Sequence, residues 1–247
     1  KLGVPLRFTF TNPVVEEKHL GDKFCNDVLK LADNGMNEVI VNSPLLEDYI
    51  RTTYPNYKIT SSTCKRITDP EKLKEELEKD YSIVVLDYDF NNQFDILEKL
   101  PQKEKMEILV NACCDAACPR RTEHYRILGM QQIAVCEHMA KNTNERFNLR
   151  DYGVPDMYCK CADRTILDVK QLSTYISPED IWEKYVPMGF NQFKLEGRTA
   201  NLFLLIDTYA YYFAKPEYRD EMRFVLTTNL QSNKIITVNK PRKENWP

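Results

Sequence analysis

The chain has 247 residues, and its 34 basic and 37 acidic side chains give a formal net charge of −3. This balance, with a pI of about 5.8, gives no overall attraction for nucleic-acid phosphates, although a local basic patch is compatible with it. A mean hydropathy of −0.52 and the lack of an apolar run near the ~20 residues that cross a bilayer exclude a transmembrane protein. No secretory signal opens the sequence, so we expect a cytoplasmic protein with no membrane contact.

Short β-branched runs alternate with helical patterns in the first half of the chain. The first strand is expected at 6–12, followed by a helix at 14–34 with Leu20, Phe24, Val28 and Leu31 at helical spacing. Further strands are expected at 38–43, 57–63, 81–89 and 107–112, with helices beginning at Pro44 and Pro70 and a helix at 91–100. A repeated strand–helix unit predicts a parallel sheet.

This rhythm breaks between Cys113 and about Ser177, where no strong strand is found. It resumes with a helix at 178–185, a strand at 191–196, helices at 198–213 and 216–226, and an apolar run at 235–238. The helix at 198–213 is apolar almost all round, so it must be covered on all sides. We expect it to pack between the barrel and the C-terminal segment rather than in a dimer.

Six strands in this rhythm favour an α/β fold of the (β/α) TIM-barrel type over an open six-stranded sheet. We expect a single barrel domain over 1–247 with a Cys-rich insertion at 113–177. The chain begins at Lys1, without a Met and just before an apolar run. We therefore expect one or two N-terminal strand–helix units of the barrel to be missing from this chain.

Polar residues end every expected strand. In a barrel, side chains at the C-terminal strand ends line the mouth, where active sites of this fold lie. Lys194 and Glu196 are the strongest candidates for active-site residues. They alternate with the apolar residues Phe193 and Leu195. Because neighbouring side chains of a strand point to opposite faces, the apolar pair would face the helices and the charged pair the interior. The other strand-end residues are Thr11, Asn12, Asn42, Ser43, Ser62, Thr63, Asp87, Asp89 and Asn111. For most of these, the alternative is that strands end in polar residues because loops begin there.

Eight cysteines are present, and in a chain able to build a full core they do not suggest a disulfide scaffold. Cys114 and Cys118 form a Cys-x3-Cys pair after the fifth strand, with Cys113 as an adjacent thiol, and Cys159 and Cys161 follow about forty residues later. Clustered thiols favour a soft metal. The irregular spacing favours a [4Fe-4S] cluster, with zinc or unligated thiols as alternatives. We expect both cysteine groups to meet at one site.

Three other cysteines, Cys25, Cys64 and Cys136, are expected to be ordinary core thiols. His124, six residues after Cys118, is a candidate ligand or acid–base group, with a surface histidine as the alternative. Arg120 and Arg121 would suit an anionic ligand at a helix start, but a solvated pair is the favoured interpretation.

The segment from Gly189 to Arg198 contains Lys194-Leu195-Glu196-Gly197-Arg198 and precedes a Tyr-rich helix. It resembles the Lys-Ile-Glu-Gly-Arg motif of the collagenase-like peptidase family, which includes RNA hydroxylation proteins and accessory proteins of oxygen-independent ubiquinone hydroxylation. The endings of the strands at 38–43 and 58–63 are also similar to that family. The resemblance implies a barrel and a four-cysteine cluster. The cysteine segment lacks the family's glycine-rich form, so this chain resembles a divergent branch.

The leading functional hypothesis is an iron–sulfur barrel protein that modifies an organic substrate, a small molecule or RNA, by oxygen-independent hydroxylation. Cys114, Cys118 and Cys159, with Cys161 or Cys113, would hold the cluster, while Lys194, Glu196 and Arg198 would bind or protonate the substrate. The alternative is a zinc-stabilised barrel that binds a protein partner as an assembly module. A peptidase-like hydrolase is third and rests on family analogy, because the sequence lacks His-Glu-x-x-His and Gly-x-Ser-x-Gly.

Overall fold

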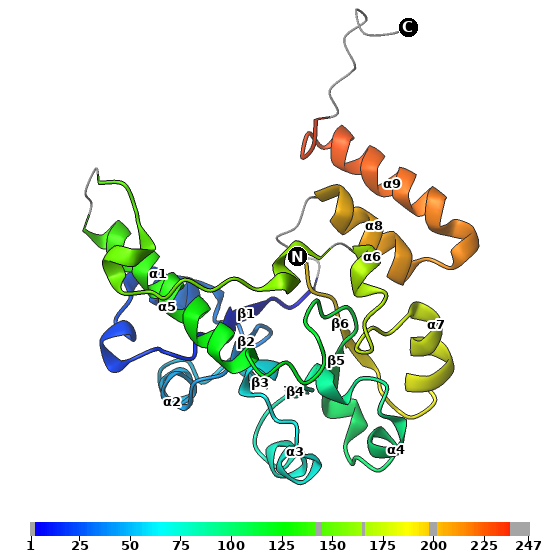
Figure 1. Cartoon of the computed structure of the whole chain (residues 1–247), viewed down its shortest axis with the longest axis horizontal. Helices are drawn as coiled ribbons and strands as arrows, with labels where there is room; N and C mark the ends of the chain where they lie inside the picture. Colours follow the sequence, from blue (N-terminus) through cyan, green and yellow to red (C-terminus); the bar gives the residue numbers. More distant parts are fainter. Residues whose placement is uncertain (1–2, 142–144, 165, 198–201, 238–247) are drawn as a thin grey trace, which may run out of the picture.

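Six parallel strands form one curled sheet, a half-barrel in which each strand pairs with the next along the chain (Figure 1). The computed structural model describes residues 3–141, 145–164, 166–197 and 202–237. Across the first four strands Thr9, Ile40, Thr60 and Ile83 lie in register. The parallel α/β architecture predicted from the sequence is confirmed. The strands are β1 (Arg7–Phe10), β2 (Glu38–Val41), β3 (Lys58–Ser61), β4 (Ile83–Val85), β5 (Met106–Leu109) and β6 (Gln192–Lys194).

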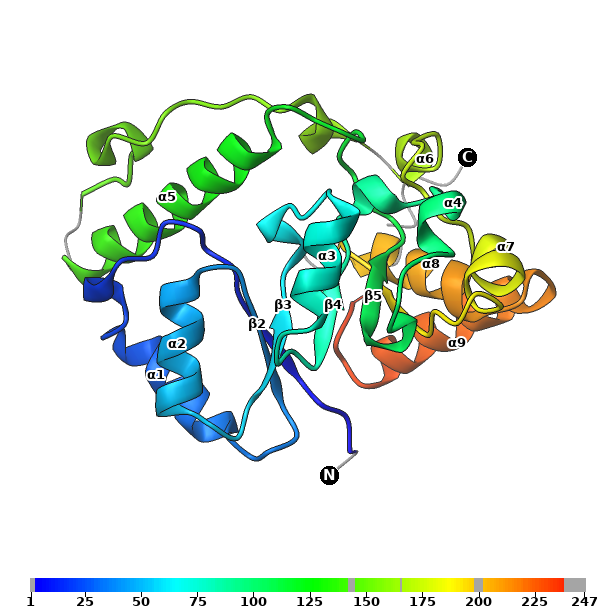
Figure 2. The ribbon, with the colours of Figure 1, turned by 90° about the horizontal axis from the view of Figure 1, so that it is seen from below.

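A helix follows each of the first four strands, and these helices flank the sheet (Figure 2). The helices are α1 (Lys23–Ala32), α2 (Pro44–Thr53), α3 (Pro70–Leu77), α4 (Phe94–Leu97), α5 (Arg121–Ala140), α6 (Ile166–Val169), α7 (Pro178–Asp180), α8 (Leu202–Phe213) and α9 (Arg219–Ser232). A π-helical turn, Ile181–Tyr185, continues α7. The short 3₁₀ helices are Glu17–His19, Thr63–Lys65, Tyr88–Phe90, Lys103–Lys105, Leu149–Tyr152, Lys160–Asp163 and Pro216–Tyr218. In the described part of the chain, none of the helices combines the length and apolarity needed to cross a membrane.

Helix starts follow the local signals in the sequence. Asp69 accepts hydrogen bonds from the backbone N–H groups of Glu71 and Lys72, so it caps α3, which begins at Pro70 as expected. Pro44 and Pro70 occupy the first position of their helices, where a missing N–H costs nothing.

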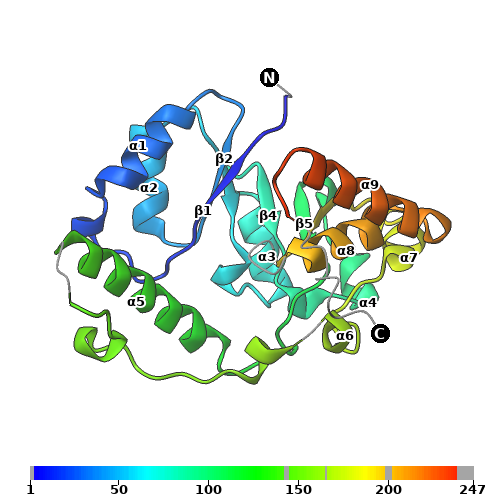
Figure 3. The same ribbon diagram turned by 90° about the horizontal axis from the view of Figure 1, so that it is seen from above.

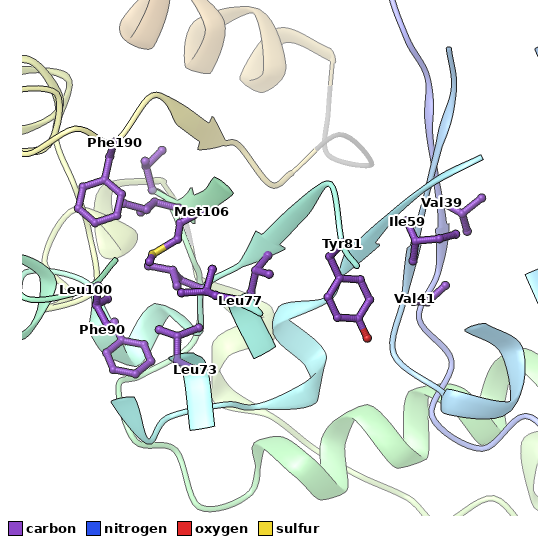
Figure 4. Close-up of a cluster of buried hydrophobic side chains, with 14 of the residues drawn as sticks. Val39, Val41, Ile59, Leu73, Leu77, Tyr81, Phe90, Leu100, Met106 and Phe190 are labelled. Atoms are coloured by element: carbon purple, nitrogen blue, oxygen red, sulfur yellow. The ribbon is translucent and has the colours of Figure 1, made fainter. Parts of the chain in front are cut away.

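The main core lies between the sheet and its flanking helices, and Figure 4 shows part of it. Val39, Val41 and Ile59 pack in one cluster with Leu73 and Leu77 of α3. Phe193 and Leu195 pack against the same core, so this apolar pair faces the helices as predicted. The opposite face of the sheet carries a smaller cluster of Ile40, Ile83 and Val85.

The first helix differs from the expected one. The segment 14–34 divides into a 3₁₀ turn and a separate helix, α1. Asp22 caps the start of α1, because its side chain accepts a hydrogen bond from the N–H of Cys25. The face of α1 is therefore rotated: Leu29 is buried, while Phe24 and Leu31 are 76% and 90% exposed. The apolar spacing predicted the helix but not its buried face.

Helix α8 lies between the half-barrel and the C-terminal helix, as expected (Figure 3). The expectation that it is covered on all sides is wrong, because Phe203 and Phe213 are 54% and 72% exposed. One side of it packs against α9. On the other side, the Tyr212 hydroxyl donates to the carbonyl oxygen of Ile176, a residue of the main core.

Candidate cysteine site at the barrel mouth

Two groups of cysteines meet at the C-terminal ends of the strands. The loop after β5 carries Cys114 and Cys118, whose side chains lie close enough to influence each other's ionisation. Helix α5 and the returning segment 145–164 arch over this end of the sheet (Figure 2). The return brings Cys159 and Cys161 to a pocket of about 240 Å³ that Cys118 also lines. The prediction that segments about forty residues apart form one cluster is therefore confirmed.

Three contacts hold the cysteine loop in place. The Asp89 carboxylate, beyond the end of β4, accepts the N–H of Ala117 at 2.8 Å, and Ala117 adopts a left-handed backbone with φ of 48°. The Glu196 carboxylate, beyond β6, accepts the N–H of Cys113 at 2.6 Å. Strands β4 and β6 thus fix the loop from both sides of β5.

Arg164 provides the third contact and ties the returning segment to the loop. Its guanidinium donates to the carbonyl oxygen of Cys113 at 2.6 Å and to the Cys161 sulfur at 3.3 Å. It also forms an ion pair with Asp115, which pairs with Lys160 as well. These contacts explain why the segment carrying Cys161 lies against the loop.

Beneath the loop, Arg121 is buried, with only 1% of its surface exposed. Its Nη2 donates to Asp87 at 2.9 Å and to Asp89 at 2.6 Å, and its guanidinium lies 4.0 Å from the centre of the Tyr88 ring. Burial opposes its charge, but Tyr88 and both carboxylates raise the pKa of Arg121 above its ordinary value. The expectation of a solvated arginine pair is wrong for Arg121, because two acidic strand ends offset its charge; Arg120 is exposed.

The two adjacent thiols on the loop are hard to ionise. Cys113 is exposed at the surface, but partial desolvation by the surrounding loop, together with the Glu196 carboxylate, raises the pKa of its thiol to about 12. Burial also raises the pKa of Cys114 to about 12; a hydrogen bond with Tyr88 opposes this rise, and the neighbouring Cys118 and Cys161 add to it. Without a metal these thiols are protonated at neutral pH and are poor nucleophiles. A metal would change this, because a coordinating thiol is deprotonated.

The side chains around the pocket have the chemistry that a metal or cluster bound by thiolates requires. Four sulfur atoms gather with cationic side chains, Arg164 and Lys160, close enough to offset thiolate charge. Over the described ranges, no three Cys, His, Asp or Glu side chains point at a common centre as metal ligands do. The structure therefore shows the sulfurs gathered but not arranged around an ion. Cys114, Cys118, Cys159 and Cys161 are the residues that would hold a cluster or zinc, with Cys113 beside them.

The structure brings most of the predicted catalytic residues to this region. His124, on α5, lines the pocket with Cys118, Cys159 and Cys161. Glu196 contacts the loop directly. Lys194 lies near Cys64 and lowers the pKa of that thiol against the larger raising effect of burial. Arg198 lies outside the described residues.

Three residues at the site were not predicted from the sequence. Cys64 was expected to be a core thiol, but it follows β3 at the mouth, near Lys194 and Arg121. Its place directly after two polar strand-end residues was the available signal. Tyr88 lies between the predicted Asp87 and Asp89, and alternation alone would have pointed it away from them. No sequence pattern pointed to Arg164, because its contacts with the cysteine loop depend on how the insertion folds.

Fold and site together define a parallel α/β half-barrel with a cysteine cluster at the C-terminal ends of its strands. No family model and no solved structure matches the chain. Among curated proteins it is similar to an uncharacterized protease of Methanocaldococcus jannaschii, with 26% identity over 174 residues that cover 69% of this chain and 47% of that protein. The chain thus spans about half the length of this relative. It is a distant homologue of a protein named as a protease.

Proposed function

We propose that this protein is an iron–sulfur-dependent half-barrel protein that modifies an organic substrate by oxygen-independent hydroxylation. The observation that carries the proposal is the gathering of Cys114, Cys118, Cys159 and Cys161 at the strand ends where active sites of barrels lie. The mixed sequence spacing of these thiols suits a cluster better than a zinc knuckle.

When bound, the cluster would supply one-electron chemistry beside the barrel mouth. The protein's own residues would position the loop and the substrate. Glu196 and Asp89 hold the backbone of the loop through the N–H groups of Cys113 and Ala117. Lys194 places a positive charge at the mouth beside Cys64, suited to a substrate oxygen that gains negative charge. His124, which lines the cysteine pocket, would hold or deliver a proton.

Anaerobic purification with iron and sulfide analysis tests this proposal. We expect bound iron and sulfide in the wild type and a loss of both in Cys118→Ser. Cys136→Ser is the matched control. The expectation that Cys136 is a core thiol is wrong, because it is exposed on α5, and the variant should keep the full iron and sulfide content. A colourless, iron-free wild type would contradict the proposal. Stoichiometric zinc with Cys118→Ser unfolding the insertion would instead support the zinc-stabilised binding module.

A peptidase-like hydrolase is a second candidate, favoured only by the similarity to the Methanocaldococcus jannaschii protein. Incubation with a panel of unstructured peptides, read by mass spectrometry, tests it. Cleavage that survives Cys118→Ser but disappears in Glu196→Gln would favour hydrolysis at the mouth without a cluster. Intact peptides would remove this candidate.

A further inference from the structure

Two arginine side chains meet at the first turn of α5, close to the C-terminal ends of β3 and β4. Arg121, the first residue of α5, and Arg66, which follows β3, approach the same carboxylate oxygen. The Nη2 atoms of Arg121 and Arg66 lie 2.6 Å and 3.7 Å from Asp89 Oδ2. Asp87 accepts a further hydrogen bond from the Arg121 Nη2 at 2.9 Å. The structure therefore holds two like charges close together at the mouth of the half-barrel.

Five buried polar atoms of this group have no hydrogen-bond partner among the described residues. They are Nε and Nη1 of Arg121, Nε of Arg66, Oγ1 of Thr63 and Oδ2 of Asp87. Buried polar groups normally have a partner, and those without one in the protein usually meet a water, an ion or a ligand. Three of the five are guanidinium nitrogens, which donate hydrogen bonds and cannot accept them. The group therefore suits a ligand with several acceptor oxygens.

The start of α5 adds positive potential at the same place. Among the described residues, no side chain caps this helix, and the backbone N–H groups at a helix N-terminus attract anions. The Arg66 Nη1 donates to the hydroxyl of Thr122, in the first turn of α5, at 3.2 Å. Glu123 of the same turn is paired with Arg126. Because Thr122 is exposed and the Arg66 side chain is 23% exposed, an anion can reach this point from solvent.

We propose that Arg66 and Arg121 form a binding site for a phosphate group at the mouth of the half-barrel. The phosphate oxygens accept hydrogen bonds from the guanidinium nitrogens that have no partner in the protein, and such charge-assisted bonds are strong. Asp87 favours phosphate over other oxyanions, because its Oδ2 can accept a hydrogen bond from a phosphate that keeps one proton. Sulfate and carboxylates lack this proton near neutral pH. The site needs no cluster, so it does not depend on the proposed function.

Isothermal titration calorimetry of the full chain with inorganic phosphate at pH 6 tests the site. We expect the wild type to bind one phosphate per chain, and Arg66→Gln and Arg121→Lys each to weaken binding at least tenfold. Lysine at position 121 keeps a cation for Asp87 and Asp89 but lacks the Nε and Nη1 donors. Arg150→Gln is the matched control, because the Arg150 side chain is 76% exposed, and it should bind phosphate as the wild type does. Near-UV circular dichroism shows which variants fold, and the partly exposed Arg66 carries the test if Arg121→Lys does not.

Other anions test the choice of phosphate. Sulfate and acetate should bind at least tenfold more weakly, because neither carries a proton for Asp87 at pH 6. Methyl phosphate distinguishes the source of the group: tighter binding than inorganic phosphate indicates a phosphate monoester, and weaker binding indicates free phosphate. Sulfate that binds as tightly as phosphate would overturn the assignment to phosphate. If the folded wild type binds no phosphate, or if Arg66→Gln binds it as tightly as the wild type, the site itself is overturned and water is the partner of these nitrogens.

Discussion

Arg7 at the start of β1 donates to both carboxylate oxygens of Glu107 on β5, at 2.7 Å each, across one hundred positions of sequence. Three strands lie between β1 and β5 in the sheet, so this contact requires strong curvature. Arg7 also donates to Glu38 on β2 at 2.8 Å, and Glu38 accepts from Thr60 on β3. A polar network therefore joins four strands on the concave face, at the end opposite the cysteine site.

Replacing Glu107 should weaken the half-barrel. Glu107→Ala removes the acceptor of two charged hydrogen bonds, and we expect the free energy of unfolding to fall by about 1.5 to 3 kcal/mol. Urea denaturation measures this change. Asp156→Ala is the control, because the Arg150–Asp156 pair is 76% and 80% exposed and should contribute little. An equal effect of both substitutions would show that the Arg7 network does not stabilise the sheet.

Glu76 on α3 should make stability depend on pH in the acid range. Burial alone would raise its pKa, but hydrogen bonds from Lys65, Lys79 and Ser61 outweigh burial and lower the pKa from 4.5 to about 2. A carboxyl with a lowered pKa in the folded state stabilises the fold above its unfolded pKa and loses this contribution as pH falls. The stability advantage of wild type over Glu76→Gln should therefore shrink between pH 4.5 and 2. Urea midpoints across that range test this, with the exposed Glu71→Gln as control.

Gly129 marks a close approach between α5 and the chain after β1. A Cβ there would lie 2.7 Å from the Asn12 Oδ1 and 3.0 Å from atoms of Pro13 and Val14. Alanine in a helix normally gains about 1 kcal/mol over glycine, but overpacking costs about 1 to 3 kcal/mol. We expect Gly129→Ala to lower the melting temperature and Gly129→Val to lower it further. Higher melting temperatures in both variants would show that the two segments separate easily.

Arg121 and Arg120 are adjacent and should respond differently to the same change. Arg121→Met leaves Asp87 and Asp89 without their buried cation, and we expect a loss of about 3 to 5 kcal/mol in the free energy of unfolding. Arg120→Met should have little effect because Arg120 is exposed.

The Arg121→Met variant should also change how stability depends on pH. Burial already raises the pKa of Asp87, and this pKa should rise further in Arg121→Met. Mild acid should therefore destabilise Arg121→Met less than the wild type, since a protonated Asp87 no longer needs a cation. Parallel pH responses of the two proteins would contradict this explanation.

The strand order was predictable from the repeated strand–helix pattern. The buried face of β6 was also predictable, because residues that alternate along a strand point to opposite faces of the sheet. Phe193 and Leu195 accordingly pack against the core. The meeting of the two cysteine groups was also predictable, from the chemistry of clustered thiols. The burial of Arg121 was not predictable. It depends on Asp87 and Asp89, which are distant in sequence and whose pairing is defined only by the packing of α5 over the sheet.

The hydrogen bond between Glu196 and Cys113 spans 83 positions and has a consequence for biosynthesis. At roughly 5 to 20 residues per second, a ribosome adds the intervening chain in roughly 4 to 17 s. During this time the cysteine loop lacks its hydrogen bond to Glu196. In this interval oxidants and free metal ions can react with the cysteine thiols of the nascent chain. Assembly of the cysteine site should therefore follow release of the C-terminal half of the chain, and a reducing environment during translation should increase the yield of correctly folded protein.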